Sequence, residues 1–193
     1  DQLDNIHIQK KERIYLTIEE MKDFLSVIDK PVIHAACATI CFTGLRVSEL
    51  CNLKLDDVNF ERNEITVVCG KGKKDRIIPM NNEIRQILMK YKKKFRNNKS
   101  DNFFSTMNSG KLTHQYLNSC IHAYSEKAGL NPKLSAHCLR HSFASALVAK
   151  NCPISVLQRL LGHADLKSSS IYLHTVQSQL IESVNTLSLK KRS

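Results

Sequence analysis

Thr43-Gly44-Leu45-Arg46-Val47-Ser48-Glu49-Leu50 joins two predicted helices and sets where the first of them ends. The helix before this segment begins at Pro31, because proline is favoured in the first helical position. Gly44 interrupts that helix, and a short helix follows over about 47–53. Arg46 and Glu49 lie three residues apart on one face of the short helix, so an ion pair between them is the simplest interpretation.

The rest of the chain predicts a mainly α fold with a small antiparallel β-sheet, in the α+β class. Ile65 and Val67 alternate with polar residues, a basic turn follows at 70–75, and the apolar pattern returns at 76–79, which predicts a β-hairpin with a basic tip. Helical spacing and capping residues predict further helices at about 17–28, 82–95, 114–128, 137–150 and 154–161. A loop is expected over 100–110, with a brief strand at Phe103-Phe104.

The composition favours a polyanionic partner. The 193 residues carry a formal net charge of +11 and a pI near 9.4, a balance typical of nucleic-acid-binding proteins but shared with proteins of other kinds. No apolar run approaches the roughly 18–20 residues that span a bilayer, so no membrane partner is expected. The polar start of the chain is not a secretory signal, which predicts a cytoplasmic location.

The seven cysteines are odd in number, and several lie in apolar helical segments, so reduced core thiols are expected. Two sets of residues have the ligand types that zinc prefers: His34 with Cys37 and Cys41, and His137 with Cys138 and His141. No paired CxxC pattern supports either set, so a structural zinc site is disfavoured. With no P-loop and no carboxylate cluster for two metals, no metal and no cofactor are expected.

Four further motifs follow in order: Gly70-Lys71-Gly72-Lys73-Lys74-Asp75-Arg76, His137-Cys138-Leu139-Arg140-His141, Leu160-Leu161-Gly162-His163 and Ile171-Tyr172. Each has an ordinary explanation when it stands alone: a solvated turn, a helical surface pair, a helix C-cap and a core tyrosine. Taken together, their side chains suit phosphodiester chemistry. Arginine offers a charged fork to phosphate oxygens, histidine moves protons near neutral pH, and tyrosine can hold a phosphoryl group covalently.

With the segment 43–50, these motifs resemble the catalytic domain of the tyrosine recombinases, the phage-integrase and Xer-like site-specific DNA recombinases. The resemblance covers about Ile14 to Leu187. It implies the tyrosine recombinase catalytic-domain fold, and metal-independent cleavage and rejoining of double-stranded DNA through a 3′-phosphotyrosine intermediate. It also implies a nucleoid-associated protein of bacterial, phage or mobile-element origin.

The resemblance assigns roles to six residues, which are Arg46, Lys71, His137, Arg140, His163 and Tyr172. The two arginines and His163 would hold the scissile phosphate, and Tyr172 would attack it. His137 matches the proposed general base. Lys71 matches the general acid for the leaving 5′-oxygen, with Lys73 as the alternative.

Further residues are expected to support these six. Glu49 and His141 would orient Arg46 and the phosphate pocket, with plain packing as the alternative for each. At the hairpin, DNA-binding residues are expected, namely Lys71, Lys73, Lys74 and Arg76.

The expected domain organisation is a linker or start of the fragment at 1–16, followed by a catalytic domain at 17–193. The N-terminal core-binding domain that family members usually carry is expected to be absent from this sequence. The amphipathic segment of about 178–189 carries four apolar residues, Leu180, Ile181, Val184 and Leu187. The resemblance implies that this segment docks on a neighbouring protomer within a DNA-bound tetramer; packing on its own domain is the alternative.

Three other functions remain open from the sequence. A type IB topoisomerase uses the same chemistry but nicks and reseals a single duplex. A DNA-binding regulator would carry a degenerate site, which the filled catalytic positions argue against. A basic helical interaction domain would explain the charge but not the ordered motifs.

Overall fold

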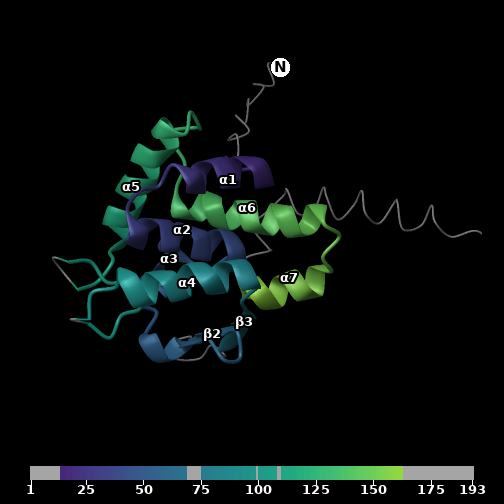
Figure 1. The fold of residues 1–193 in the computed structure, drawn as a ribbon. Helices are drawn as coiled ribbons and strands as arrows, with labels where there is room; N and C mark the ends of the chain where they lie inside the picture. Colours follow the sequence, from purple (N-terminus) through teal and green to yellow (C-terminus); the bar gives the residue numbers. More distant parts are fainter. Residues whose placement is uncertain (1–13, 69–74, 99, 108–109, 163–193) are drawn as a thin grey trace, which may run out of the picture.

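Helix α2 (Pro31–Thr43) lies at the centre of the fold, with α6 (Ala136–Ala149) on one side and α4 (Asn82–Lys94) on the other, as Figure 1 shows. The structure is a computed structural model and describes residues 14–68, 75–98, 100–107 and 110–162. Most α2 residues are buried, and many are small, so neighbouring helices approach its backbone closely.

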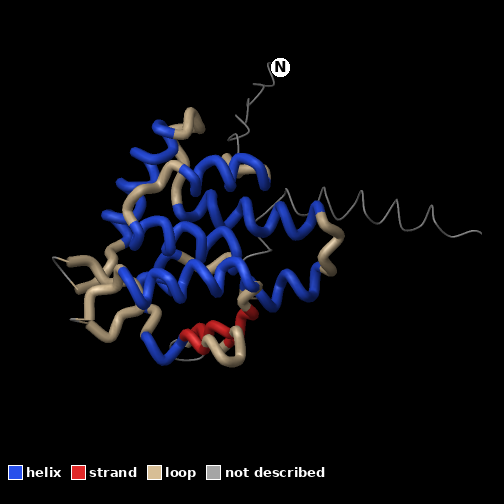
Figure 2. Tube along the Cα trace, viewed as in Figure 1, coloured by secondary structure: helices blue, strands red, loops and turns tan. Residues whose placement is uncertain are grey.

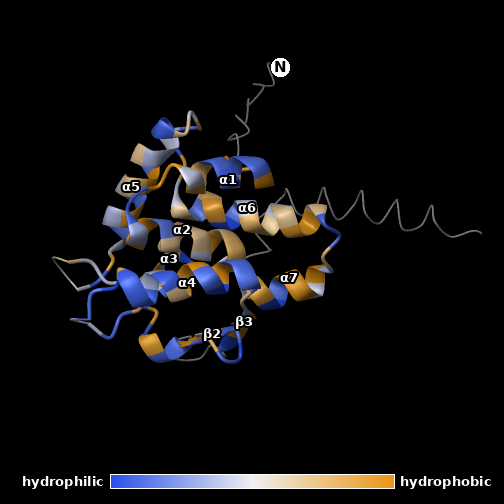
Figure 3. Ribbon diagram, in the orientation of Figure 1, coloured by the Kyte–Doolittle hydropathy of each residue, from blue (hydrophilic) through white to orange (hydrophobic). Residues whose placement is uncertain are grey.

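The other helices surround this centre. Helix α1 (Ile18–Ser26) contacts both α2 and α6, and α5 (His114–Lys127) contacts α2, α3 and α6. The short α3 (Val47–Asn52) follows α2 directly, and α7 (Ile154–Leu161) packs on α6 and on the sheet. In Figure 3, α4 and α7 show hydrophilic and hydrophobic residues side by side, the pattern of helices with one buried face.

The predicted helix boundaries are confirmed to within a few residues, because local capping sets them. Thr17 and Glu20 form the expected reciprocal capping box, in which the Glu20 N–H donates to Thr17 Oγ1 at 3.2 Å. Side chains that accept from the first turn of a helix also start α4, α5 and α6; they belong to Asn81, Thr113 and Ser135.

A three-stranded antiparallel sheet lies at one edge of the helical body (Figure 2). Its strands are β1 (Val58–Asn59), β2 (Glu64–Val67) and β3 (Arg76–Pro79), and a 3₁₀ turn at Leu55–Asp57 precedes them. The predicted hairpin is confirmed as β2 and β3, with Val67 opposite Arg76. Strand β1 was not predicted, since two residues are too few to show an alternating pattern.

The brief strand predicted at Phe103-Phe104 is wrong. Instead, an isolated bridge joins Lys54 and Asn102, and the Phe103 N–H donates to the carbonyl of Leu53 at 2.7 Å. Both phenylalanine rings are buried and lie against Tyr91, with ring centroids 6.0 and 5.7 Å from that ring. Burial of these rings explains the apolar pattern that sequence alone assigned to a strand.

Gly44 ends α2 with φ +65°, a left-handed conformation that favours glycine. A Cβ atom at this position would lie 2.4 Å from Cδ1 of Phe143 and 2.8 Å from Cδ2 of Leu161. The chain therefore turns toward α3 at a point where side chains of α6 and α7 leave no room for a side chain on residue 44.

We predict that Gly44→Ala destabilises the fold more than Gly129→Ala does. Gly129 has a similar φ of +68°, but no atom lies within 4 Å of its Cβ position, so only the backbone cost of about 1–2 kcal/mol applies there. Overpacking at Gly44 adds about 1–3 kcal/mol. Urea unfolding of both variants measures the difference, and equal losses would contradict the close packing described at Gly44.

Candidate active site

The carboxylate of Glu49 binds two arginines from different parts of the fold. Arg76 donates to it from both terminal nitrogens, Nη1 to Oε1 and Nη2 to Oε2, each at 2.8 Å. Arg46 donates from Nη1 to Oε1 and from its backbone N–H to Oε2, again at 2.8 Å. The Arg46–Glu49 pairing suggested by their spacing is confirmed, and the bond to Arg76 extends it to the sheet.

Helix α3 with the residue before it, and strand β3, supply the three side chains of this cluster. Arg46 immediately precedes α3, Glu49 lies in the first turn of α3, and Arg76 is the first residue of β3. Arg76 also donates from Nε to the carbonyl of Leu160 near the end of α7, at 2.9 Å. One guanidinium therefore connects the sheet, α3 and α7.

Exposure differs between the two arginines. The side chain of Arg46 is 31% exposed, whereas those of Arg76 and Glu49 are 10% and 12% exposed. Burial alone would raise the pKa of Glu49, but the hydrogen bonds and charges of Arg76 and Arg46 outweigh it and lower this pKa to about 2. The carboxylate is thus ionised at neutral pH, and two positive charges beside one negative charge give the cluster a net charge of +1.

Arg140 is buried beside the same segments. Its side chain donates from Nη1 to the carbonyl of Gly44 and from Nη2 to the carbonyl of Leu161, the latter at 2.7 Å. Gly44 lies two residues before Arg46, and Leu161 is the last residue of α7. Arg46 and Arg140 are therefore tied to the same junction and do not lie on opposite faces of the domain.

Gly162 ends α7 directly against the arginines. A Cβ atom at this position would lie 3.6 and 3.7 Å from the Nη1 and Nη2 atoms of Arg46, and 3.8 Å from Nη1 of Arg76. The φ of +83° at Gly162 is a further reason for glycine there.

His137 and His141 face each other on α6, with their Nε2 atoms 2.7 Å apart and their rings nearly perpendicular at 87°. A hydrogen bond of this kind requires one ring to donate a proton that the other accepts. Burial, and then the charge of Arg140, lower the pKa of His137. His137 is therefore neutral near pH 7 and can accept a proton.

Five predicted site residues, Lys71, Lys73, Lys74, His163 and Tyr172, lie outside the described residues. Their roles, and those of Arg46, His137 and Arg140, stay predictions. Arg76 was expected to bind DNA, yet its guanidinium contacts Glu49 and Leu160. Sequence reasoning missed the backbone acceptors at Gly44, Leu160 and Leu161, because nothing in a sequence marks a carbonyl group as the partner of a distant arginine.

A cavity of about 600 Å³ opens beside the arginine cluster. Arg46, just before α3, and Glu49 on α3 line one side of it, and Thr66, Val67 and Val68 line it from β2 and the residue that follows β2. Arg76 is not among its lining residues. Of the two arginines on Glu49, Arg46 is thus the one that faces this hollow.

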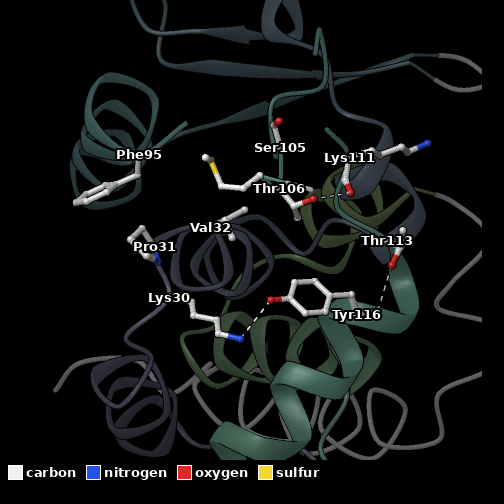
Figure 4. A pocket seen from close by; sticks show the side chains of 10 residues that line it. Lys30, Pro31, Val32, Phe95, Ser105, Thr106, Lys111, Thr113 and Tyr116 are labelled. Atoms are coloured by element: carbon white, nitrogen blue, oxygen red, sulfur yellow. Dashed lines mark hydrogen bonds between the residues drawn. The ribbon is translucent and has the colours of Figure 1, made fainter. Parts of the chain in front are cut away.

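A second hollow, of about 510 Å³, lies at the start of α2, the opposite end of that helix from Gly44. Figure 4 shows Lys30 and Tyr116 meeting across it, where Lys30 Nζ donates to the Tyr116 hydroxyl at 3.2 Å. Of the predicted catalytic residues that the structure describes, which are Arg46, His137 and Arg140, none is among the residues that line this hollow.

Within the described ranges, no group of three or more histidine, cysteine, aspartate or glutamate side chains has the arrangement of a metal site. Cys37 and Cys41, two of the conceivable zinc ligands, are buried, and burial raises the pKa of Cys41 to about 12. Such thiols stay protonated at neutral pH, as expected for core cysteines. No helix in this part of the chain is long and apolar enough to cross a membrane.

The chain belongs to the phage integrase family, whose sequence profile matches residues 14–179. It is 36% identical over 193 aligned residues to the tyrosine recombinase XerA of Pyrococcus furiosus, covering 98% of this chain and 67% of that protein. It is 33% identical over 185 residues to tyrosine recombinase XerC of Halalkalibacterium halodurans, covering 89% of this chain and 61% of that protein.

Solved structures confirm the predicted tyrosine recombinase catalytic-domain fold. A crystal structure of XerA recombinase matches with a TM-score of 0.77 and 29% identity, covering 93% of this chain and 66% of that one. XerH site-specific recombinase bound to its palindromic difH substrate, in a post-cleavage complex, matches with a TM-score of 0.69 and 30% identity, covering 90% of this chain and 53% of that one. The chain spans about half to two thirds of the length of the curated relatives it matches.

We predict that Glu49→Gln costs about 3 kcal/mol of unfolding free energy at pH 7. The pKa of Glu49 in the folded chain, about 2, lies below its ordinary value of 4.5. The stabilisation is therefore fully present above about pH 4.5 and is lost as the pH falls toward 2, so the variant and the parent should converge in acid.

Urea unfolding at pH 7 and at several lower pH values checks this expectation. Glu19→Gln is the matched control, because Glu19 forms an ion pair with Lys22 at 2.9 Å in which both side chains are mostly exposed. Such a pair contributes less than about 1 kcal/mol. A Glu49→Gln loss no larger than the control loss, or one that persists unchanged in acid, would contradict the role given to Glu49.

Proposed function

We propose that this chain is the catalytic domain of a site-specific DNA recombinase that breaks and rejoins double-stranded DNA through a 3′-phosphotyrosine intermediate. The observation that carries the proposal is the cluster of Arg46, Arg76 and Glu49 at Gly162, where α7 ends. It sets a net positive site beside a cavity in a chain of the phage integrase family. The XerH site-specific recombinase, solved with its difH substrate after cleavage, supports DNA as the partner.

In the proposed reaction, Arg46 and Arg140 stabilise the negative charge that builds on the scissile phosphate, and His163 donates to the same oxygens. Arginines in such positions contribute on the order of 10³–10⁵ in the rate of phosphoryl transfer. Arg140 is nearly fixed by its two carbonyl partners, so its position needs little reorganisation when DNA binds.

The covalent step exchanges one phosphoester bond for another. The hydroxyl oxygen of Tyr172 forms a bond to phosphorus while the bond from phosphorus to the 5′-oxygen breaks. His137, neutral near pH 7 and held by His141, accepts the tyrosine proton, and Lys71 donates a proton to the leaving 5′-oxygen. Attack by another 5′-hydroxyl reverses the steps and joins new partners, so no external energy source is needed.

Removing the Tyr172 hydroxyl should abolish the covalent adduct. Tyr172→Phe keeps the ring, so DNA affinity should stay within about threefold, since phosphate contacts dominate that affinity. The assay incubates the protein with a suicide duplex carrying its native site and counts covalent protein–DNA adduct under denaturing conditions.

Tyr116→Phe is the control for that assay. Its hydroxyl contacts Lys30 in the hollow at the far end of α2, so adduct should form at the parent level. Adduct formation by Tyr172→Phe would refute the assignment of the nucleophile.

We also propose that the segment of about 178–189 docks on a neighbouring protomer, and that a tetramer forms on DNA. Burial of its four apolar side chains would contribute roughly 1.5–3 kcal/mol each before the cost of ordering the segment. That is enough to assemble a complex on DNA, while the free protein remains a monomer.

Deleting residues 177–193 should therefore weaken cooperative DNA binding more than single-site binding. Gel-shift titrations on one-site and two-site duplexes measure both quantities. Deleting only 190–193, which removes the basic end and keeps the apolar residues, is the control and should retain cooperativity. Equal loss of single-site and cooperative binding on the longer deletion would instead indicate that the segment packs on its own domain.

A further inference from the structure

Arg76 uses all three nitrogens of its guanidinium on protein acceptors. Nη1 and Nη2 each donate to one oxygen of Glu49 at 2.8 Å, and Nε donates to the Leu160 carbonyl at 2.9 Å. A planar fork held at three points has a fixed position and orientation. Because Arg76 is not among the residues that line the 600 Å³ cavity, direct phosphate binding there does not explain its placement.

Glu49 presents an electrostatic problem for a phosphate-binding site. Its ionised carboxylate lies 2.8 Å from Nη1 of Arg46, so the two charges on that pair sum to zero. Glu49 also lines the same cavity as Arg46, where it would repel an approaching phosphate. Arg76 supplies the second positive charge, which brings the three side chains to a net +1.

We propose that Arg76 is a positioning residue for phosphate binding. By engaging the Glu49 carboxylate, it offsets the negative charge that would otherwise cancel the charge of Arg46, and it holds Arg46 at the cavity. The role of Arg76 rests on the proposed function, since the anion concerned is the phosphate group of DNA. Arg76 does this through its hydrogen bonds to both Glu49 oxygens, while its bond to the Leu160 carbonyl fixes its own position.

The role of Arg76 makes a specific double-variant prediction. Arg76→Gln leaves Glu49 ionised beside Arg46 and should weaken anion binding. Adding Glu49→Gln removes the carboxylate that Arg76 offsets, so the double variant should recover binding although it lacks more native contacts. A residue that only stabilised the fold would give the opposite order.

Inorganic phosphate is the probe, titrated into isotope-labelled protein and followed by NMR at the Arg46 side chain. Arg76→Gln should raise the dissociation constant about tenfold, as expected for one lost close charge, and the Glu49→Gln, Arg76→Gln pair should return to within about threefold of the parent. Arg85→Gln is the matched control: Arg85 donates from Nε to the Phe60 carbonyl at 3.2 Å and does not touch Glu49, so its loss should leave phosphate binding unchanged. All samples are measured well below their unfolding midpoints.

The same variants are then compared for single-turnover cleavage of the suicide duplex at saturating protein. Arg76→Gln should be about 10–100-fold slower than the parent, and the double variant should regain at least about fivefold. The proposal is overturned if Arg76→Gln behaves like Arg85→Gln, or if the double variant is no better than Arg76→Gln in the phosphate titration. Failure of the parent to form any adduct would count against the proposed function, and the phosphate titration would still decide the role of Arg76.

Discussion

Glu49 accepts hydrogen bonds from Arg46 beside its own helix and from Arg76 on strand β3, so one largely buried carboxylate joins two parts of the fold. Burying this charge is costly, and the cost is offset only because both oxygens are fully engaged by cations. Removal of a partner from such a pair typically costs about 3–5 kcal/mol, since an uncompensated charge is left behind. Through this carboxylate and Arg76, the position of α3 is coupled to the positions of the sheet and the end of α7.

Arg140 makes the second set of hydrogen bonds that joins helix ends near this carboxylate. It is buried, and its nitrogens satisfy the carbonyl groups of Gly44 and Leu161, where α2 and α7 end. Helix ends leave carbonyl groups without helical partners, and a buried arginine can satisfy two of them at once. Gly44 makes this junction compact, because a side chain there would collide with Phe143 and Leu161. The site is thus built where helix ends meet, with its charges set before any DNA arrives.

Local sequence signals predicted most of the fold. Helix starts at Thr17, Asn81, Thr113 and Ser135 were predictable because each cap bonds within its own first turn. The hairpin followed from alternation over a few residues. The bridge between Lys54 and Asn102 was not predictable, because its partners are far apart in sequence and carry no pattern of their own.

In the candidate site, too, the local contacts were predictable from the sequence and the long-range contacts were not. The spacing of Arg46 and Glu49 predicted their pairing, since both lie on one helical turn. The bond from Arg76 to Glu49 and the burial of Arg140 depend on how α7 packs against the sheet and α6, which no local pattern encodes. The order of the motifs in the sequence supplied the family resemblance and, through it, the expected roles, but the contacts that hold Arg46 in place came from the structure.

We infer that Glu49 and Arg76 act as one unit, and a double-mutant cycle on the free energy of unfolding tests this coupling most directly. Glu49→Gln, Arg76→Gln and the double variant are compared with the parent protein by urea unfolding at pH 7. Buried, bidentate contact predicts a coupling energy of about 1–3 kcal/mol between the two positions. Additive losses, with a coupling below about 0.5 kcal/mol, would contradict the claim.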